Sequence, residues 1–133
     1  MKYRKGYKYQ LAESITIQTI LRPPEDIFIN FAVLYKDGRF RLTLGYACDG
    51  ASGCTLDTPG TFRGAFFHDA GYEMLRKGKL PPSWRKDFDK LAHKLWSEDM
   101  LFQFRADTWY RAVRNLAGFA ADPKNIKKVY ETP

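Results

Sequence analysis

The first third of the chain has the alternating hydrophobic and polar pattern of β-strands. Residues 14–21 are rich in Ile and Thr, and Pro23-Pro24 then ends the run. A second apolar run covers residues 27–35 and leads into Asp37-Gly38, the dipeptide that most strongly indicates a tight hairpin. The returning segment places Phe40, Leu42, Leu44 and Tyr46 on one face. The sequence therefore predicts a small antiparallel sheet with one covered face.

The second half has the pattern of three helices. The first is predicted from about Thr61 to Arg76, because Lys77-Gly78 gives a basic end followed by glycine. The second follows Pro81-Pro82, with Ser83 as its N-cap. The third is predicted over roughly residues 103–120. Helix two has one apolar stripe of Phe88, Leu91, Ala92 and Leu95, and helix three is expected to bury Trp109, Val113, Leu116 and Ala117.

Strands followed by helices predict an α+β fold, in which an N-terminal antiparallel hairpin or small sheet packs against a three-helix C-terminal half. We expect one domain over residues 1–133, with a basic aromatic arm at 1–10 and a polar tail at 122–133. The 44% hydrophobic and 16% aromatic content excludes a disordered protein. No apolar run approaches the roughly 20 residues of a membrane span, and no secretory signal is recognisable. Synthesis in the cytoplasm is therefore expected.

The net charge of +7 favours anionic partners such as nucleic acid, anionic lipid or an acidic protein surface. Basic residues and tyrosines alternate most densely within residues 1–10, a pattern found in single-strand binding segments and at membrane interfaces, although a solvated arm or docking strand is the commoner use. No nucleic-acid-binding motif is evident, so that class is disfavoured. Cys48 and Cys54 do not have zinc-site spacing, and a disulfide between them remains open.

The clearest candidate chemistry lies in the first predicted helix, where His68 precedes Asp69 and shares a helical face with Tyr72. Asp89 lies beside the apolar stripe of helix two and should point partly inward, toward His68. A carboxylate bonded to one imidazole nitrogen leaves the other nitrogen able to take a proton from water. Tyr72 could hold the same carboxylate. The predicted catalytic residues are therefore His68, Asp89 and Tyr72.

Asp69 is predicted to have a different function, as a ligand for Ca²⁺. The glycine-rich loop before the helix could add backbone oxygens, and its predicted ligands are Asp49, Gly50 and Ser52. A bound cation would stabilise an oxyanion during acyl transfer. The alternative is that His68 and Asp69 form a buried polar pair that only fixes helix packing, with Asp49-Gly50 as a plain turn. His93, four residues after Asp89, is a second possible partner and is more simply a surface residue.

Much of the chain resembles a family common in phages and prophages, domain of unknown function 1353. The matching pieces are Tyr46, residues 49–53, residues 56–58, Arg63-Gly64, residues 68–72, residues 78–80, Arg85-Lys86, Asp89, Arg105-Ala106 and residues 109–114. Cys54 departs from the pattern, which has Pro after the Ser-Gly. The resemblance implies a viral or prophage origin and carries no established activity.

A second, local resemblance links His68-Asp69, Tyr72 and Asp89 to the paired active-site helices of phospholipases A2 of the short bacterial type. It implies that His68 activates water, that Asp69 and the loop over residues 49–53 bind Ca²⁺, and that Asp89 orients His68. Those enzymes are usually exported and rich in disulfides, whereas this chain has two cysteines and no recognisable signal.

Together these patterns predict a phage- or prophage-encoded, Ca²⁺-dependent hydrolase of lipid acyl esters, acting at an anionic bacterial membrane. The alternative is a non-enzymatic virion or tail-associated protein that binds other virion proteins. Either would be made in the host cytoplasm and then directed to the envelope or the virus particle.

Overall fold

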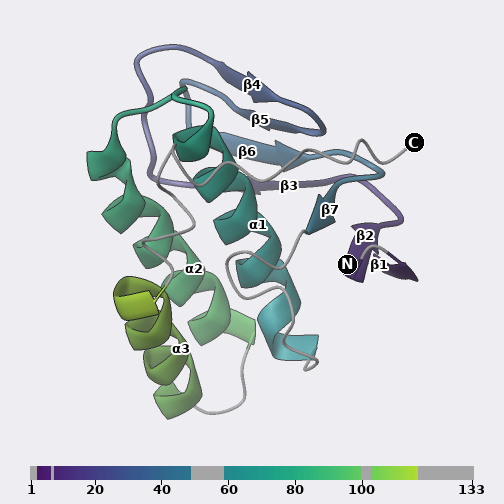
Figure 1. The fold of residues 1–133 in the computed structure, drawn as a ribbon, viewed down its shortest axis with the longest axis vertical. Coiled ribbons are helices and arrows are strands. Elements are labelled where there is room, and N and C mark those ends of the chain that lie inside the picture. Colours follow the sequence, from purple (N-terminus) through teal and green to yellow (C-terminus); the bar gives the residue numbers. More distant parts are fainter. Residues whose placement is uncertain (1–2, 7, 49–58, 100–102, 117–133) are drawn as a thin grey trace.

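The computed structural model describes residues 3–6, 8–48, 59–99 and 103–116, which form two antiparallel sheets followed by three helices (Figure 1). The smaller sheet has the order β1 (Tyr3–Gly6), β2 (Lys8–Leu11), β7 (Ala47–Cys48). The larger has the order β3 (Ile15–Gln18), β6 (Arg39–Leu42), β5 (Ala32–Leu34), β4 (Ile27–Ile29). The helices are α1 (Pro59–Arg76), α2 (Arg85–Asp99) and α3 (Gln103–Leu116). The predicted α+β class is confirmed.

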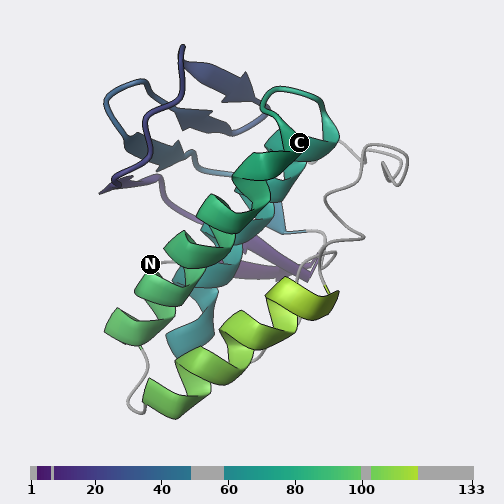
Figure 2. The same ribbon diagram turned by 90° about the vertical axis from the view of Figure 1, so that its left-hand side faces the viewer.

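The helices follow one another away from the sheets. Helix α1 contacts β4 and β6 of the larger sheet and β7 of the smaller one, α2 packs along α1, and α3 packs on α2. Figure 1 shows α1 and α2 side by side below the larger sheet, and Figure 2 shows α3 crossing near their lower ends. Helix α1 therefore has strands on one side and α2 on the other, which places its central residues in the interior.

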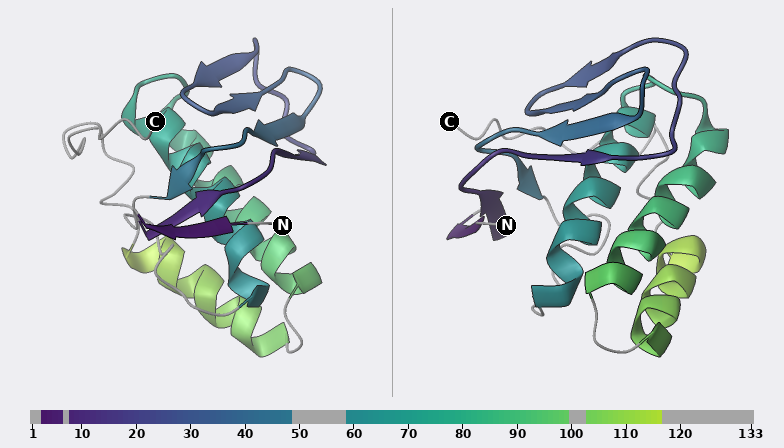
Figure 3. Two further views of the ribbon diagram at one scale, coloured as in Figure 1. Left: turned by 90° about the vertical axis from the view of Figure 1, so that its right-hand side faces the viewer. Right: turned by 180° about the vertical axis from the view of Figure 1, so that it is seen from behind.

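The described part of the basic segment at residues 1–10 forms a β-hairpin with Leu11, as the docking-strand alternative allows. In β1 and β2 the register runs from Tyr3 opposite Leu11 to Gly6 opposite Lys8. Strand β2 then pairs with β7, and the backbone N–H of Leu11 donates to the carbonyl of Tyr46 at 2.8 Å. Figure 3 shows this hairpin beside β7, at one end of the larger sheet. The hairpin thus forms hydrogen bonds with residues 46–48 of the chain.

The apolar run over residues 27–35 is not one continuous strand. The segment divides into β4 and β5, which pair with Ile29 opposite Ala32 around the two residues Asn30 and Phe31. Phe31 turns the chain with φ 66°, a left-handed conformation that is uncommon for a bulky residue. Its carbonyl accepts the N–H of Thr43 at 2.9 Å. No glycine or proline marks this turn, so the apolar pattern concealed it.

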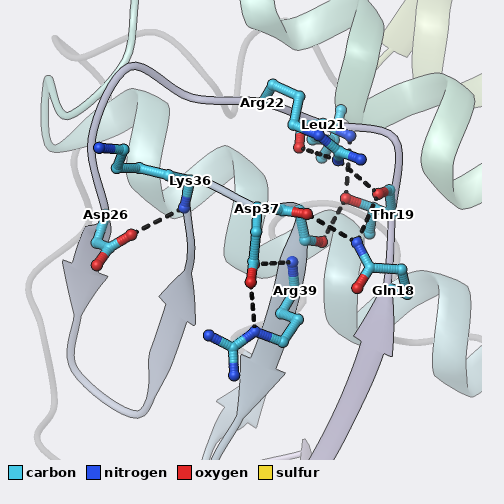
Figure 4. A network of polar contacts seen from close by, with 9 residues as sticks. Gln18, Thr19, Leu21, Arg22, Asp26, Lys36, Asp37 and Arg39 are labelled. Carbon is cyan, nitrogen blue, oxygen red and sulfur yellow. Dashed lines mark hydrogen bonds and ion pairs between the residues drawn. The ribbon is translucent and has the colours of Figure 1, made fainter.

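The Asp37-Gly38 hairpin is confirmed, with Gly38 at φ 93° between β5 and β6. Figure 4 shows how the end of β3 is tied to this turn: Nε2 of Gln18 donates to the Asp37 carbonyl at 2.8 Å, and the Thr19 hydroxyl donates to the Gly38 carbonyl at 2.7 Å. A Cβ on Gly38 would lie 2.4 Å from the Thr19 carbonyl oxygen. Only glycine therefore suits this position.

Three of the four predicted inward-facing residues after this hairpin are buried: Phe40, Leu42 and Tyr46. Leu44 is 55% exposed, which contradicts the prediction. The alternation fails because β6 ends at Leu42, and the chain turns with Gly45 at φ 98° and the Tyr46 N–H donating to the Thr43 carbonyl. Tyr46 enters the core after the turn.

Helix α1 ends where the sequence predicts. Gly78 has φ 70°, its N–H donates to the Leu75 carbonyl, and the Lys79 N–H donates to the Met74 carbonyl, which together form a Schellman motif. Ser83 is not the N-cap of α2, because a 3₁₀ turn over Pro82–Trp84 precedes Arg85 and includes it.

The predicted stripe of α2 is confirmed, since Phe88, Leu91, Ala92 and Leu95 are all buried. Helix α3 is described from Gln103 to Leu116, where Ala106 is buried. The side chains of Trp109, Val113 and Leu116 lie outside the described residues, as do Ala117 and the polar tail.

Candidate functional site

The central pair of the site joins α1 to α2. Nε2 of His68 lies 2.6 Å from Oδ1 of Asp89, and both side chains are fully buried. The close approach of the two helices makes this contact possible: a Cβ on Gly71 would lie 2.4 Å from the Phe88 ring, and one on Gly64 would lie 2.5 Å from Trp96. The predicted His68–Asp89 contact is therefore present.

Tyr72 completes the predicted trio. Its hydroxyl donates to the same Oδ1 of Asp89 at 2.5 Å, and its ring lies 4.1 Å from the His68 ring, centroid to centroid. Burial, together with the neighbouring Asp89 carboxylate, raises the pKa of Tyr72, so the phenol stays protonated and donates. The imidazole of His68 is thus held by a hydrogen bond at Nε2 and by ring packing against Tyr72.

In the described structure, the second imidazole nitrogen of His68, Nδ1, lacks the hydrogen bond that Nε2 has. Nδ1 of His68 is buried and has no hydrogen-bond partner among the described residues. A buried polar atom without a partner costs about 1–3 kcal/mol, so such atoms are rare and call for an explanation. When Nε2 donates to an ionised Asp89, Nδ1 carries the lone pair and can accept a proton.

Two arginines that the sequence interpretation did not assign to the site contact Asp89. Nη1 of Arg114, on α3, lies 2.9 Å from Oδ2 of Asp89, and Nε of Arg85 lies 3.8 Å from the same oxygen. Burial alone would raise the pKa of Asp89, but hydrogen bonds from His68, Tyr72 and Arg114 outweigh it and lower that pKa below its usual value of 3.8. Asp89 is therefore a carboxylate at neutral pH.

The contacts of the two arginines with Asp89 differ in whether the sequence could have predicted them. Arg85 precedes Asp89 by four residues on α2, a spacing at which helical side chains meet, so its contact could have been predicted. Arg114 follows Asp89 by 25 residues. That contact depends on how α3 crosses α2, and the local sequence pattern does not predict this crossing.

Asp69 lies on another face of α1 and takes no part in the His68 pair. Its Oδ2 accepts a hydrogen bond from the hydroxyl of Tyr46 at 2.8 Å, and its side chain is 1% exposed. Tyr46 is two residues before Cys48, where the smaller sheet ends. The carboxylate of Asp69 thus contacts the segment that leads into the predicted metal-binding loop.

The loop residues predicted as ligands, Asp49, Gly50 and Ser52, lie outside the described residues. Cys48, immediately before them, is disulfide-bonded, and Cys54 is the chain's only other cysteine. Within the described ranges, no group of three or more His, Cys, Asp or Glu side chains could hold a metal ion. Asp69 offers a carboxylate, the donor type that Ca²⁺ prefers, and the other predicted ligands lie in the loop.

His93 is not a partner of Asp89. Its Nε2 lies 2.6 Å from Oδ1 of Asp107, and its ring packs against Tyr110 at 4.9 Å, centroid to centroid, so it joins α2 to α3. Both members of this pair are partly exposed. The described residues therefore contain two His–Asp pairs, one buried between α1 and α2 and one near the surface between α2 and α3.

No family model, curated protein or solved structure matches the chain. The resemblances to domain of unknown function 1353 and to phospholipase A2 therefore stay predictions from the motifs. In the part of the chain that the structure describes, none of the helices has both the length and the apolar character to cross a membrane.

Proposed function

We propose that the protein is a hydrolase of carboxylic esters in which His68 activates water. The observation that carries this proposal is the arrangement of the His68 ring: Nε2 is bonded to a buried Asp89 carboxylate, while Nδ1 has no hydrogen-bond partner among the described residues. An imidazole oriented in this way can act as a general base. Helix packing alone would be satisfied by an apolar residue at position 68, without an unpaired buried nitrogen.

In the proposed reaction, His68 moves one proton from water to the leaving group. Nδ1 of His68 accepts a proton from water as the water oxygen bonds to the ester carbonyl carbon. Asp89 and Tyr72 stabilise the imidazolium that results, because Oδ1 of Asp89 lies at Nε2 and the Tyr72 hydroxyl donates to that oxygen. As the ester C–O bond breaks, the leaving alkoxide takes the proton from Nδ1. The products are a carboxylic acid and an alcohol, and His68 is neutral again.

Asp69 would hold Ca²⁺ together with Asp49, Gly50 and Ser52 of the loop. A bound cation there would supply Lewis-acid stabilisation of the oxyanion formed at the ester carbonyl. The chain's own contribution is the Asp69 carboxylate, which the Tyr46 hydroxyl holds in place at 2.8 Å. His68 and Asp69 are adjacent, so one turn of α1 would carry both the base and a metal ligand.

The proposed substrate is the acyl ester of a membrane lipid, acted on by a phage- or prophage-encoded enzyme. This part rests on the two resemblances and on the net charge of +7, which favours an anionic bacterial membrane. Each Lys or Arg near such a surface contributes on the order of 1 kcal/mol to binding. Virion proteins are the other class of partner that a phage origin suggests.

The test compares two histidine variants. His68→Asn should lower the rate of fatty-acid release from anionic phospholipid vesicles by a factor of about 100 or more, since general-base catalysis contributes about 10²–10⁴-fold. His93→Asn is the matched control, because His93 also pairs with an aspartate and joins two helices. Its rate should stay within about twofold of the parent protein. Equal rates for the parent and His68→Asn would reject the proposal.

One observation favours a non-enzymatic function instead. His68, Asp69, Tyr72 and Asp89 are all buried, with at most 1% exposure, as in a polar network that fixes the packing of a core. A virion or tail-associated protein could use such a network only for stability. In that case His68→Asn would lower the melting temperature, the parent protein would release no fatty acid, and Ca²⁺ would not change its melting temperature.

A further inference from the structure

The carboxylate of Asp89 has two different sides. Oδ1 faces α1, where Nε2 of His68 and the Tyr72 hydroxyl lie at 2.6 and 2.5 Å. Oδ2 faces the guanidiniums of Arg114 at 2.9 Å and of Arg85 at 3.8 Å. These four groups, from α1, α2 and α3, are the charged and titratable side chains in contact with Asp89 within the described residues.

Arg85 and Arg114 are joined to one another as well. Nη2 of Arg85 donates to the backbone carbonyl of Arg114 at 2.7 Å. Arg85 on α2 therefore bonds to the same α3 residue whose guanidinium bonds to Asp89. The side chains of Arg85 and Arg114 are 28% and 32% exposed, whereas Asp89 is fully buried. The ion pair therefore extends from the interior to the surface, with its basic end outside.

An aspartate carboxylate rotates readily about its last side-chain bond, because that torsion has a broad energy profile. Donors on Oδ1 alone would leave the carboxylate plane free to tilt away from Nε2 of His68. A charged donor on Oδ2 fixes the plane from the opposite side, and charge-assisted bonds are about twice as strong as neutral ones. Arg114 is the closer of the two cations and lies on a different helix from Asp89.

We propose that Arg114 is a positioning residue for the reaction inferred above: through Oδ2 it holds the Asp89 carboxylate in the orientation that fixes His68. This inference rests on the proposed function for its effect on rate, and on the contacts of Asp89 for its effect on His68. It also gives α3 a function, because Arg114 on that helix then determines, through Asp89, how the imidazole is held.

The choice of arginine follows from this geometry. A guanidinium is planar and always charged, and it offers several donors in fixed directions, whereas a lysine ammonium is a single strongly hydrated charge. Lysine at position 114 would keep the charge and lose the directed bond to Oδ2. Glutamine would lose the charge and retain a polar group of similar length.

The test uses Arg114→Gln and Arg114→Lys, with Arg111→Gln as the control, because Arg111 is exposed on the same helix and its loss changes the net charge equally. In Arg114→Gln, kcat should fall by about 10- to 100-fold while KM stays within about twofold, as expected when a reacting group is slightly misplaced. Arg114→Lys should lie between this variant and the parent. Arg111→Gln should match the parent.

Two further measurements separate positioning from folding. In ¹⁵N-labelled protein, the strongly downfield imidazole N–H proton of a histidine bonded to a buried carboxylate should be seen in the parent and lost or shifted in Arg114→Gln. In Arg114→Ala, added guanidinium ion at non-denaturing concentration should restore at least about a tenth of the lost kcat, because it can occupy the vacated position beside Oδ2.

The outcomes are distinguishable. An unchanged downfield proton and an unchanged kcat in Arg114→Gln would reject the inference. A fall in kcat with a lower melting temperature, no loss of the downfield proton and no rescue by guanidinium would also reject it, since Arg114 would then be only structural. If the parent hydrolyses no ester, the proposed function fails, and the imidazole proton still decides whether Arg114 controls the His68–Asp89 contact.

Discussion

Asp89 joins all three helices at a single side chain. It accepts hydrogen bonds from Tyr72 on α1 and Arg114 on α3, and it lies 2.6 Å from Nε2 of His68. An ionised carboxylate in a protein interior is costly unless several donors stabilise it. Because three donors and a second guanidinium surround it, Asp89 stabilises the fold as well as orienting His68.

Asp89→Asn should lower the free energy of unfolding at neutral pH by about 3 kcal/mol, since it removes the charge to which three groups are bonded. The folded-state pKa of Asp89 is below its ordinary value of 3.8, so its contribution is complete above that value and is lost as pH falls through the folded-state pKa. The gap between parent and variant should therefore close below about pH 4. Urea unfolding at a series of pH values measures it.

Asp87→Asn is the control for this series, because Asp87 is exposed on the same helix. Its stability should stay within about 0.5 kcal/mol of the parent at every pH. A gap for Asp89→Asn that persists unchanged at low pH would show that the carboxylate's charge contributes nothing, and that only its shape matters.

Among single contacts, the sequence predicted those that depend on the crossing of α1 and α2 alone. The spacing of His68 and Tyr72 places them on one face of α1, and the buried stripe of α2 turns Asp89 inward, so the trio could be inferred. Tyr46 was predicted to face the core, but its bond to Asp69 requires the turn after Leu42 that the alternating pattern did not reveal. Arg114 depends on a second crossing and was missed.

At the scale of elements, the crossing of α1 and α2 depends on two glycines. Gly64 and Gly71 are seven residues apart on α1 and lie against Trp96 and Phe88 of α2. Neither glycine has a positive φ, so the need is for space rather than for an unusual backbone conformation. The helices approach closely enough for the 2.6 Å contact between His68 and Asp89 because these side chains are absent.

Gly71→Ala should therefore destabilise the fold by about 1–3 kcal/mol, because a Cβ would lie 2.4 Å from the Phe88 ring. Alanine otherwise favours a helix over glycine by about 1 kcal/mol, so a destabilising result would identify the clash as its cause. Adding Phe88→Leu should recover part of the loss, with a coupling of about 1 kcal/mol in a double-mutant cycle. Additive effects of the two changes, measured by urea unfolding, would contradict the close approach.

The sequence predicted one of the two hairpin turns in the larger sheet and missed the other. Asp37-Gly38 was correctly located because glycine supplies the left-handed conformation that its turn needs. The turn between β4 and β5 uses Asn30 and Phe31, and Phe31 adopts φ 66° without being a turn-forming residue. Its carbonyl is bonded to Thr43, a contact made only once the sheet is assembled. Tertiary contacts, rather than local preference, therefore determine that turn.

For the whole molecule, the order of packing places the candidate chemistry in the interior. Helix α1 lies between the strands and α2, and α3 covers α2 on the far side (Figure 2). The sequence predicted strands first and helices second. Which element packs on which face of α1 depends on where that helix is apolar and where it carries glycine. Asp69 on one face of α1 meets Tyr46 from the sheet side, whereas His68 on another face meets Asp89 from α2.

The face of α1 that carries Asp69 is the one proposed to bind Ca²⁺. If Asp69 and the loop over residues 49–53 bind the ion only in the folded state, millimolar Ca²⁺ must raise the melting temperature by mass action. A concentration of about 100 times Kd stabilises by about 2.7 kcal/mol, which corresponds to roughly 5–15 °C for a domain of this size. Thermal melts with Ca²⁺, Mg²⁺ and EDTA measure the shift.

Asp69→Asn should abolish the Ca²⁺-dependent rise, since it removes the carboxylate proposed as a Ca²⁺ ligand, while Asp87→Asn should retain it. A rise that Mg²⁺ reproduces would indicate general charge screening, because Mg²⁺ demands a smaller and more rigid octahedral site. No rise in the parent would remove the cation from the mechanism and leave the His68–Asp89 pair as the whole of the candidate chemistry. A rise that survives Asp69→Asn would place the ion elsewhere in the chain, and Asp69 would then only anchor Tyr46 to α1.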